Sequence, residues 1–352
     1  MFFLSTQMGD QRHDKAKLIG KEFYMAEYFE GKSADEVWEK AAMRLLEQNN
    51  TIDGRTGEVY EVLHAFISIE DPKQKWIYNR IPPMSLAFAL AELIWIMNGE
   101  NDAKVINFWN PVLKKYAGND AAYYGAYGKR IRSQFGFDQL EKAYQALQNV
   151  PESRQVVIQI YDTRTDFPIE NGKPRAEDIP CNICSLLKVR NNKLEWTQIM
   201  RSNDVLLGLP YNFIQFTGLQ EIMAGWLEIQ VGTYNHYSDS LHLYKRDIDK
   251  IGIAREKKIE NSDSLALNKI ESDKIFKEMY ERMIQLSNSK ISEKDIWLLT
   301  RLKSQYSAYN NIMYVLGSYC ARKRKMEGLA EEMINQCSNN LYKQMWQRWI
   351  HK

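Results

Sequence analysis

The sequence predicts an α/β (α+β) body over residues 1–250, followed by a helical extension over residues 251–352. Within the body, apolar runs rich in β-branched residues alternate with segments of helical character, which is typical of helices packed around a sheet. Beyond residue 250 lysine, glutamate and serine dominate, glycine and proline nearly vanish, and apolar residues recur at helical spacing. We place the boundary where composition and period change together.

The elements of the body follow from hydrophobic period, caps and breakers. Aromatic residues near 107–111 and 123–128 show no helical period, so we expect them in loops. The predicted elements are a helix capped by Ser33 over 34–48, a strand over 59–69, helices over 86–97 and 137–149, strands over 156–161, 185–189 and 194–200, a helix over 213–226, and strands over 232–237 and 241–244.

The helix over 86–97 is the most informative of these elements. It follows Pro82 and Pro83, which suit the first turn of a helix, and it is apolar on nearly every face. It should therefore be buried. Glu92 is its single charged residue, and a carboxylate in such a place is costly unless it is paired, protonated or catalytic.

The extension is predicted to contain helices over 272–286, 293–322 and 326–350, the second of which need not be continuous. Such an extension can serve in oligomerisation or as a lid. Its helices are rich in lysine but also carry many acids, so we expect a solvated face and no RNA-binding surface.

Composition argues against a general attraction to nucleic acid or membrane. The chain has 352 residues, 44% of them hydrophobic and 26% charged, with a formal net charge of +2. Its first residues contain too short an apolar run for a signal peptide, and no run is long enough to span a bilayer. Four cysteines in a chain of this length do not make a disulfide framework. We expect a cytoplasmic protein with reduced thiols and no nucleic-acid or membrane partner.

Between residues 178 and 212 a thiol, a cationic cluster and an amide follow one another. Cys181 comes after a proline; a lone cysteine is usually a small buried residue, and its spacing from Cys184 suggests metal or redox chemistry. Zinc is not expected, because no second cysteine pair and no histidine pair is near. Arg201 and Ser202 most often mark a solvated strand end. Beside a thiol, the same residues can bind a phosphate and favour the thiolate.

Other positions have both a structural and a functional reading. Asn212 is either a capping residue or an amide that pairs with the O4 and N3–H edge of uracil. His242 and Tyr244 alternate on one strand and face the same side, as a packing pair or as ligand contacts. Arg55, in a Gly-Arg-Thr-Gly loop, is either an exposed turn charge or an anion binder.

The order and spacing of these motifs resemble the thymidylate synthase superfamily, which includes the pyrimidine nucleotide hydroxymethylases. The resemblance extends over roughly residues 36–250 and depends on the colinear set, since each motif is weak alone. The set is Arg55-Thr-Gly, Glu92-Leu-x-Trp95, Trp109, Tyr127-Gly-Lys, Ser153-Arg154, Pro180-Cys181, Arg201-Ser-x-Asp204, Leu207-Gly-Leu-Pro-Tyr-Asn212 and His242-x-Tyr244.

The resemblance implies a mixed sheet with surrounding helices, stacked back to back in a homodimer. It implies transfer of a one-carbon unit from 5,10-methylenetetrahydrofolate, without a metal, to C5 of a nucleotide, most simply deoxyuridylate (dUMP). The implied catalytic roles are attack on C6 of the base by Cys181, proton transfer by Glu92 and positioning of the nucleophile region by Tyr127. In nucleotide binding, Asn212 would read the base, His242 and Tyr244 would bind the sugar, and the phosphate would be bound by Arg55, Arg201, Ser202 and, from the other subunit, Arg154. Asp204 and Trp109 would contact the folate.

The sequence departs from the synthase pattern at several positions. Asn182 replaces the usual histidine after the nucleophile, and Gln155 replaces a second arginine. The short apolar C-terminal tail that closes over folate in synthases is not recognisable. Residues 200–205 and 240–244 resemble the hydroxymethylases, in which water captures the transferred carbon. Asn212, in contrast, suits uracil and not cytosine.

The sequence therefore favours reductive methylation of dUMP, with hydroxymethylation of dUMP or deoxycytidylate (dCMP) as the close alternative. A third reading is a non-catalytic homologue that binds a nucleotide and uses the extension to bind a partner. The intact Cys181, Glu92 and Asn212 argue against this third reading.

Overall fold

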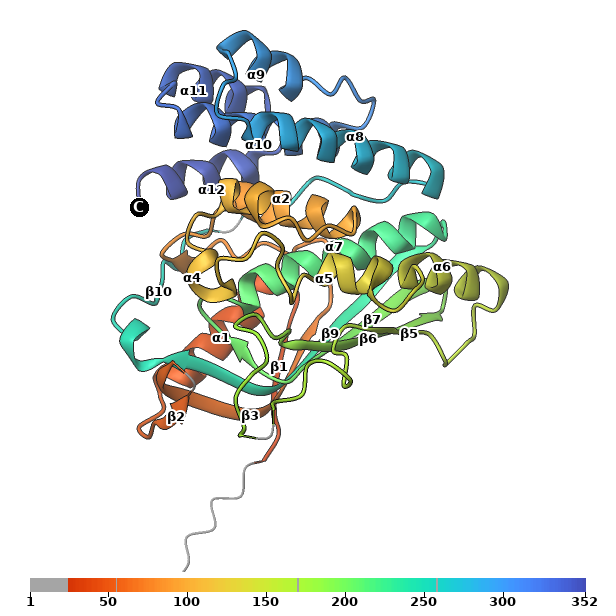
Figure 1. Ribbon diagram of the computed structural model, residues 1–352, viewed down its shortest axis with the longest axis vertical. Helices are drawn as coiled ribbons and strands as arrows, with labels where there is room; N and C mark the ends of the chain where they lie inside the picture. The colour runs from red at the N-terminus through yellow and green to blue at the C-terminus, as the bar shows by residue number, and fades with distance from the viewer. Residues whose placement is uncertain (1–24, 55, 170, 258) are drawn as a thin grey trace, which may run out of the picture.

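The computed structural model describes residues 25–352 apart from 55, 170 and 258, and its elements form three layers. A mixed β-sheet is the first layer, helices of the body cover one of its faces, and the C-terminal helices cover those in turn (Figure 1). One cluster of buried apolar side chains includes residues of both helical layers. The predicted α/β class with a helical extension is confirmed.

The large sheet has eight strands in the order β1-β3-β9-β7-β6-β5, with β2 paired to β3 and β8 paired to β9. It is mixed because β1 with β3, β7 with β9 and β8 with β9 are parallel pairs, whereas the other pairs are antiparallel. A small second sheet joins β4 and β10. The strands are β1 (Glu27–Gly31), β2 (Ile52–Gly54), β3 (Gly57–Ile69), β4 (Arg80–Ile81), β5 (Val157–Gln159), β6 (Asn182–Arg190), β7 (Lys193–Met200), β8 (Asn203–Asp204), β9 (Gln230–Tyr244) and β10 (Gly252–Ile253).

The strand predictions are confirmed in the centre of the sheet and less accurate at its edges. The predicted turn between β6 and β7 lies at Asn191 and Asn192, whose φ angles of 51° and 58° are those of a tight hairpin. The two predicted runs over 232–244 form one continuous strand, β9. At the edges, β5 is shorter than predicted and β1 was not predicted, since an edge strand needs less apolar sequence than a central one.

Two helices of the middle layer, α2 and α7, position the predicted site. Helix α2 (Leu86–Met97) is capped by Ser85, which accepts a hydrogen bond from the N–H of Phe88. Helix α7 (Leu209–Trp226) begins at Leu209 and not at 213, with a proline in its first turn, so Asn212 lies within the helix. Both helices are buried almost completely, because the sheet lies below them and the extension above.

The remaining helices of the body are short or peripheral. The prediction of a loop at 107–111 is wrong for its first part, because Asn107–Trp109 complete a helix that Asp102 caps through two N–H groups. The other helices are α1 (Ala34–Leu46), α3 (Ala103–Trp109), α4 (Lys114–Ala117), α5 (Tyr127–Lys129), a π-helical turn (Arg130–Gln134), α6 (Gln139–Asn149) and a 3₁₀ turn (Lys245–Asp247).

The extension consists of α8 (Lys269–Ser287), α9 (Glu293–Thr300), α10 (Ser307–Lys323), α11 (Glu327–Gln336) and α12 (Asn340–Ile350). The segment 293–322 is indeed broken, into α9 and α10. The prediction of one helix over 326–350 is wrong. Asn339 separates α11 from α12, because its side chain caps α12 by accepting a hydrogen bond from the N–H of Leu341.

Polar contacts fix the extension and the segment before it to the body. Asn98, which ends α2, donates a hydrogen bond of 3.1 Å from Nδ2 to the carbonyl of Phe276 in α8. In the body, Lys75 and Glu221 form a buried ion pair of 2.7 Å. Glu221 also accepts a hydrogen bond of 3.0 Å from the N–H of Leu265, just before α8. The extension therefore shares its interior with the helices that carry the predicted site.

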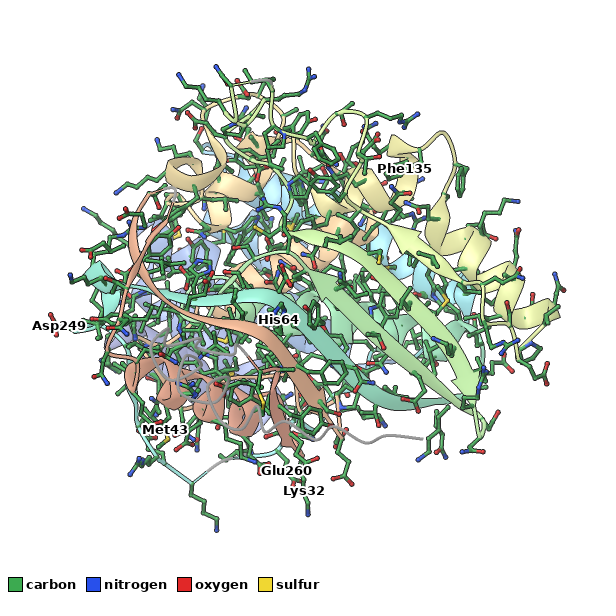
Figure 2. The ribbon with its side chains drawn as sticks, turned by 90° about the horizontal axis from the view of Figure 1, so that it is seen from below. Lys32, Met43, His64, Phe135, Asp249 and Glu260 are labelled. Carbon is green, nitrogen blue, oxygen red and sulfur yellow. The ribbon has the colours of Figure 1, made fainter. Side chains whose placement is uncertain are left out.

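No helix of the described residues covers the opposite face of the large sheet, as Figure 2 shows. Tyr28 is 58% exposed and Val157 is 51% exposed. The ring of Tyr28 stacks on that of Phe66, with 5.6 Å between centroids. His64, near the middle of this view, has a positive φ of 58°. This uncovered face combines apolar rings and polar groups.

Candidate functional site

Helix α2 carries Glu92, its one residue that is not fully buried, at the end of a chain of side-chain amides. Gln215 of α7 donates a hydrogen bond of 2.6 Å from Nε2 to Oε2 of Glu92. Burial raises the pKa of Glu92 to about 7, the charge of Asp178 adds to the rise, and the hydrogen bond from Gln215 opposes it. A carboxyl group with such a pKa can accept and donate a proton near neutral pH.

Asn212 is the next member of this chain. It donates a hydrogen bond of 3.0 Å from Nδ2 to Oε1 of Gln215. Because Nε2 of Gln215 points to Glu92, its Oε1 must point to Asn212, and this assigns the orientation of both amides. Asn212 is 5% exposed, and its Oδ1 has no hydrogen-bond partner among the described residues. The site thus presents a buried acceptor in need of a donor.

Tyr127 opens α5 and lies close to Cys181, which directly precedes β6. Burial is the main cause that raises the pKa of Tyr127, and the negative charges of Cys181, Asp178 and Glu92 add to it. These side chains therefore lie within electrostatic range of one another. We call the four predicted residues that the structure brings together the Cys181 cluster: Glu92, Tyr127, Cys181 and Asn212.

Arg201 supports the chain at Cys181. Its Nε donates to the carbonyl of Pro180 and its Nη2 to that of Ile179, both at 3.1 Å. Its main-chain N–H donates to the carbonyl of Cys181 at 2.9 Å. The guanidinium group is thereby placed next to the thiol segment, and Ser202 follows it between β7 and β8. Binding of phosphate by Arg201 and Ser202 stays a prediction.

Asp204 and His242 face each other across the parallel pair of β8 and β9. Oδ1 of Asp204 accepts hydrogen bonds from the N–H groups of Leu206 and Leu207 at 2.7 and 2.8 Å. Burial raises the pKa of Asp204 and lowers that of His242, and the attraction between the two charged forms opposes both changes. The ring of Tyr244 lies 5.3 Å from that of His242, on the same side of β9.

The other predicted site residues lie apart from these contacts or outside the described residues. Trp109, at the end of α3, is 1% exposed, and its Nε1 has no hydrogen-bond partner in the part of the chain that the structure describes. Arg154 is exposed in the connection between α6 and β5. Arg55 lies outside the described residues.

Two polar residues of this site were not predicted from the sequence. Gln215 links Asn212 to Glu92. The sequence offered one sign of this contact: Gln215 follows Asn212 by three residues, and residues so spaced on a helix are neighbours. Asp178 acts on both Glu92 and Tyr127 through its charge, and its Oδ2 accepts a hydrogen bond of 2.9 Å from the N–H of Gly125. No periodicity marks Asp178, because it lies in an irregular segment.

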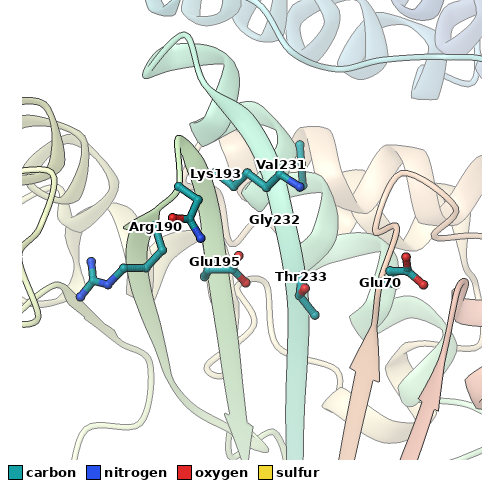
Figure 3. A pocket seen from close by; sticks show the side chains of 8 residues that line it. Glu70, Arg190, Lys193, Glu195, Val231, Gly232 and Thr233 are labelled. Atoms are coloured by element: carbon teal, nitrogen blue, oxygen red, sulfur yellow. The ribbon is translucent and has the colours of Figure 1, made fainter.

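A surface cavity of about 250 Å³ lies at the other end of the β6–β7 hairpin from Cys181 (Figure 3). It contains none of the predicted site residues, so we assign it no part in the site. The residues that line it are Glu70, Arg190, Asn191, Lys193, Glu195, Val231, Gly232 and Thr233.

Two further kinds of feature are absent from residues 25–352, leaving aside residues 55, 170 and 258. The described residues contain no group of three or more histidine, cysteine or acidic side chains arranged to hold a metal ion. Nor do they contain a helix that is long and apolar enough to cross a bilayer.

The chain belongs to the thymidylate synthase family, whose model, described as "Thymidylate synthase", matches residues 40–294. The match covers the strands and helices that carry every member of the Cys181 cluster. It also extends beyond residue 250, through α8 and into α9.

Individual relatives fall into two groups. A "Deoxyuridylate hydroxymethyltransferase" of Bacillus phage SP01 is 27% identical over 62% of this chain, and one of Pseudomonas phage M6 is 29% identical over 47% of it. A "Thymidylate synthase" of Clostridium beijerinckii is 25% identical over 66% of this chain and 87% of its own length. The chain spans only 59% and 46% of the two phage proteins.

Proposed function

We propose that this protein transfers a one-carbon unit from 5,10-methylenetetrahydrofolate to C5 of dUMP, as a thymidylate synthase. The chain of hydrogen bonds from Asn212 through Gln215 to Glu92, beside Cys181, is the observation that supports this most directly. It joins a group that can read a base to a group that can move a proton, next to a nucleophile.

Each member of the Cys181 cluster has a separate task in this proposal. The Cys181 thiolate forms a bond to C6 of the base, and the electron pair of the C5–C6 double bond moves toward O4, which makes C5 nucleophilic. Glu92 holds or releases the proton that later steps need, which its pKa of about 7 permits. Tyr127 stays a neutral phenol, because its pKa is raised, and it can donate a hydrogen bond at the thiol region.

The unpartnered Oδ1 of Asn212 favours uracil over cytosine. Uracil has an N–H donor at N3 and an acceptor at O4, so it can donate to Oδ1 and accept from Nδ2. Cytosine has an acceptor at N3, which would face Oδ1 and leave two buried acceptors opposed. This Oδ1 atom, which has no hydrogen-bond partner among the described residues, thus supports dUMP as the substrate.

The folate supplies the carbon and, in a synthase, the hydride that reduces it. Two groups of this chain fit such a ligand. Nε1 of Trp109 is a buried donor without a partner among the described residues, and Asp204 uses Oδ1 for two N–H groups and keeps Oδ2 for another donor. We expect Asp204 to contact the pterin and Trp109 to lie near the transferred carbon.

Hydroxymethylation of dUMP is the second candidate, and the two phage relatives favour it. Here the oxygen of a water molecule bonds to the transferred carbon, the water gives up a proton, and tetrahydrofolate leaves unoxidised. The Cys181 cluster serves both reactions equally, because they share the adduct at C6.

We further propose a homodimer in which the uncovered sheet faces of two copies pack together. Tyr28 and Val157 leave apolar surface on this face, and Arg154 lies exposed just before β5, where it can reach a neighbouring copy. Light scattering should give a dimer mass for the wild type. Val157→Lys, which replaces an exposed residue, should shift the mass to that of a monomer; an unchanged dimer would place the interface elsewhere.

The test of function is incubation of the protein with methylenetetrahydrofolate and either dUMP or dCMP, followed by mass spectrometry. Thymidylate with dihydrofolate identifies a synthase, and hydroxymethyl-dUMP with tetrahydrofolate identifies the second candidate. Cys181→Ala should abolish turnover and keep nucleotide binding, whereas Cys184→Ala, the matched control, should stay active. Nucleotide binding without any product in the wild type would contradict the enzymatic proposal.

A further inference from the structure

Helix α10 of the extension holds the end of α3, where Trp109 lies. The ammonium group of Lys323 donates a hydrogen bond to the carbonyl of Phe108 and lies 4.3 Å from the centroid of its ring. The hydroxyl of Tyr319 donates to the same carbonyl at 3.4 Å. Two side chains of α10 thus bind the residue that precedes Trp109.

Tyr319 also contacts the indole itself. The centroids of the Tyr319 and Trp109 rings are 5.4 Å apart, and those of Tyr319 and Trp349, from α12, are 5.5 Å apart. Tyr319 therefore lies between an aromatic residue of the body and one of the last helix. Such ring pairs contribute about 0.5–1.5 kcal/mol beyond the area they bury.

The hydroxyl of Tyr319 is also within electrostatic range of Tyr211, in the first turn of α7. Burial raises the pKa of Tyr319 to about 12, and the nearby Tyr211 adds to this. Tyr211 precedes Asn212, and its hydroxyl accepts a hydrogen bond of 3.0 Å from the N–H of Ser85, the cap of α2. Tyr319 thus lies where the end of α3 and the starts of α2 and α7 meet.

We infer that Tyr319 is a positioning residue that fixes the Trp109 indole, and that the extension is thereby a part of the one-carbon transfer site. This inference rests on the proposed function, because it takes Trp109 as a neighbour of the folate. Tyr319 itself touches Trp109 and Phe108 and acts on the site through them. Its effect should fall on folate binding and on the fate of the transferred carbon, and much less on dUMP.

The experiment compares Tyr319→Leu with Tyr309→Leu in the full-length protein. Both tyrosines are buried in α10, but Tyr309 contacts Phe276 and the carbonyl of Leu265, within the extension and its connection. The Tyr309 variant therefore controls for general loosening of α10. Tyr319→Phe keeps the ring contacts and should behave nearly as the wild type.

Hydrogen exchange of residues 103–110 is the first readout and needs no activity. Loss of the ring contact should speed exchange of this segment about three- to tenfold in Tyr319→Leu, and leave it unchanged in Tyr309→Leu. Equal exchange in the two variants would overturn the inference, whether or not the wild type turns over dUMP.

The second readout is the Michaelis constant of each substrate. Tyr319→Leu should raise the KM for methylenetetrahydrofolate about tenfold, because the Trp109 indole would no longer be held in place beside the folate, with the KM for dUMP nearly unchanged. An unchanged folate KM, or equal increases for both substrates, would refute the positioning role while leaving the proposed function intact. An inactive wild type would refute the proposed function, and with it the role of Tyr319 in folate binding.

Discussion

Replacing Glu92 with Gln tests whether the buried carboxyl group is held neutral in the folded protein. Burial raises its pKa from 4.5 to about 7. A carboxyl group whose pKa is raised on folding stabilises the protein below its unfolded pKa, and this stabilisation is lost as the pH rises toward the folded pKa. Glutamine keeps the shape and can accept the same hydrogen bond from Gln215, but it does not titrate.

The expected magnitude follows from the two pKa values. Linkage with these values makes the Glu92 contribution about 2.5 kcal/mol less favourable at about pH 8 than at about pH 5. The free energy of unfolding, measured by urea denaturation, should therefore fall more steeply with pH for the wild type than for Glu92→Gln. The two curves should separate by this amount between those pH values.

The matched control is Glu281→Gln, which removes one carboxylate from an exposed position of α8. Its curve should run parallel to that of the wild type over the same range. Parallel curves for Glu92→Gln and the wild type would refute the reasoning, because they would mean that Glu92 titrates alike in the folded and unfolded chains.

For three further substitutions, the contacts in the structure predict the direction of the change in pKa or in stability. Asp178→Asn removes a negative charge that raises the pKa of Glu92, so the pKa near neutrality in the pH profile of kcat/KM should fall; a rise would contradict the assignment. Gln215→Leu removes the hydrogen bond that favours the charged form, so the same pKa should rise, and the opposite signs of the two variants are the internal control. Lys75→Met leaves Glu221 buried without its ion-pair partner and should cost about 3–5 kcal/mol in urea denaturation. The double variant with Glu221→Gln should recover part of this loss, and no recovery would mean that the cost is one of packing.

Much of the fold could be predicted from local sequence. The apolar run of α2, the Asn191-Asn192 turn and the cap at Ser33 are local signals, and the structure contains the elements they predicted. The prediction of helix boundaries failed where a polar side chain caps a helix. Asn339 lies between α11 and α12 and caps the start of α12. Asp102 caps the start of α3, the helix that contains the aromatic residues before residue 110. Period alone does not reveal such caps, because the flanking apolar residues continue the helical pattern.

The sequence predicted which residues belong to the candidate site, but only the three-dimensional structure shows how they contact one another. The sequence supplied a cysteine after a proline and an acid within an apolar helix. It gave no sign that Gln215 joins Asn212 to Glu92, since the carboxyl group and the amide are 123 positions apart in the chain. Asp178 likewise acts on Glu92 only because its irregular segment passes beside α2.

The sequence by itself determined which residues are chemically capable, the α/β character of the body and the helical character of the extension. These follow from side-chain type and from spacing over a few residues, which are properties of the chain alone. The tertiary structure decided which of these residues meet, how far burial raises the pKa of Glu92, and that Tyr319 of α10 lies against both Trp109 and Trp349 of α12. The reason is physical: burial and long-range contacts depend on how the layers pack, and packing joins residues that no local period connects.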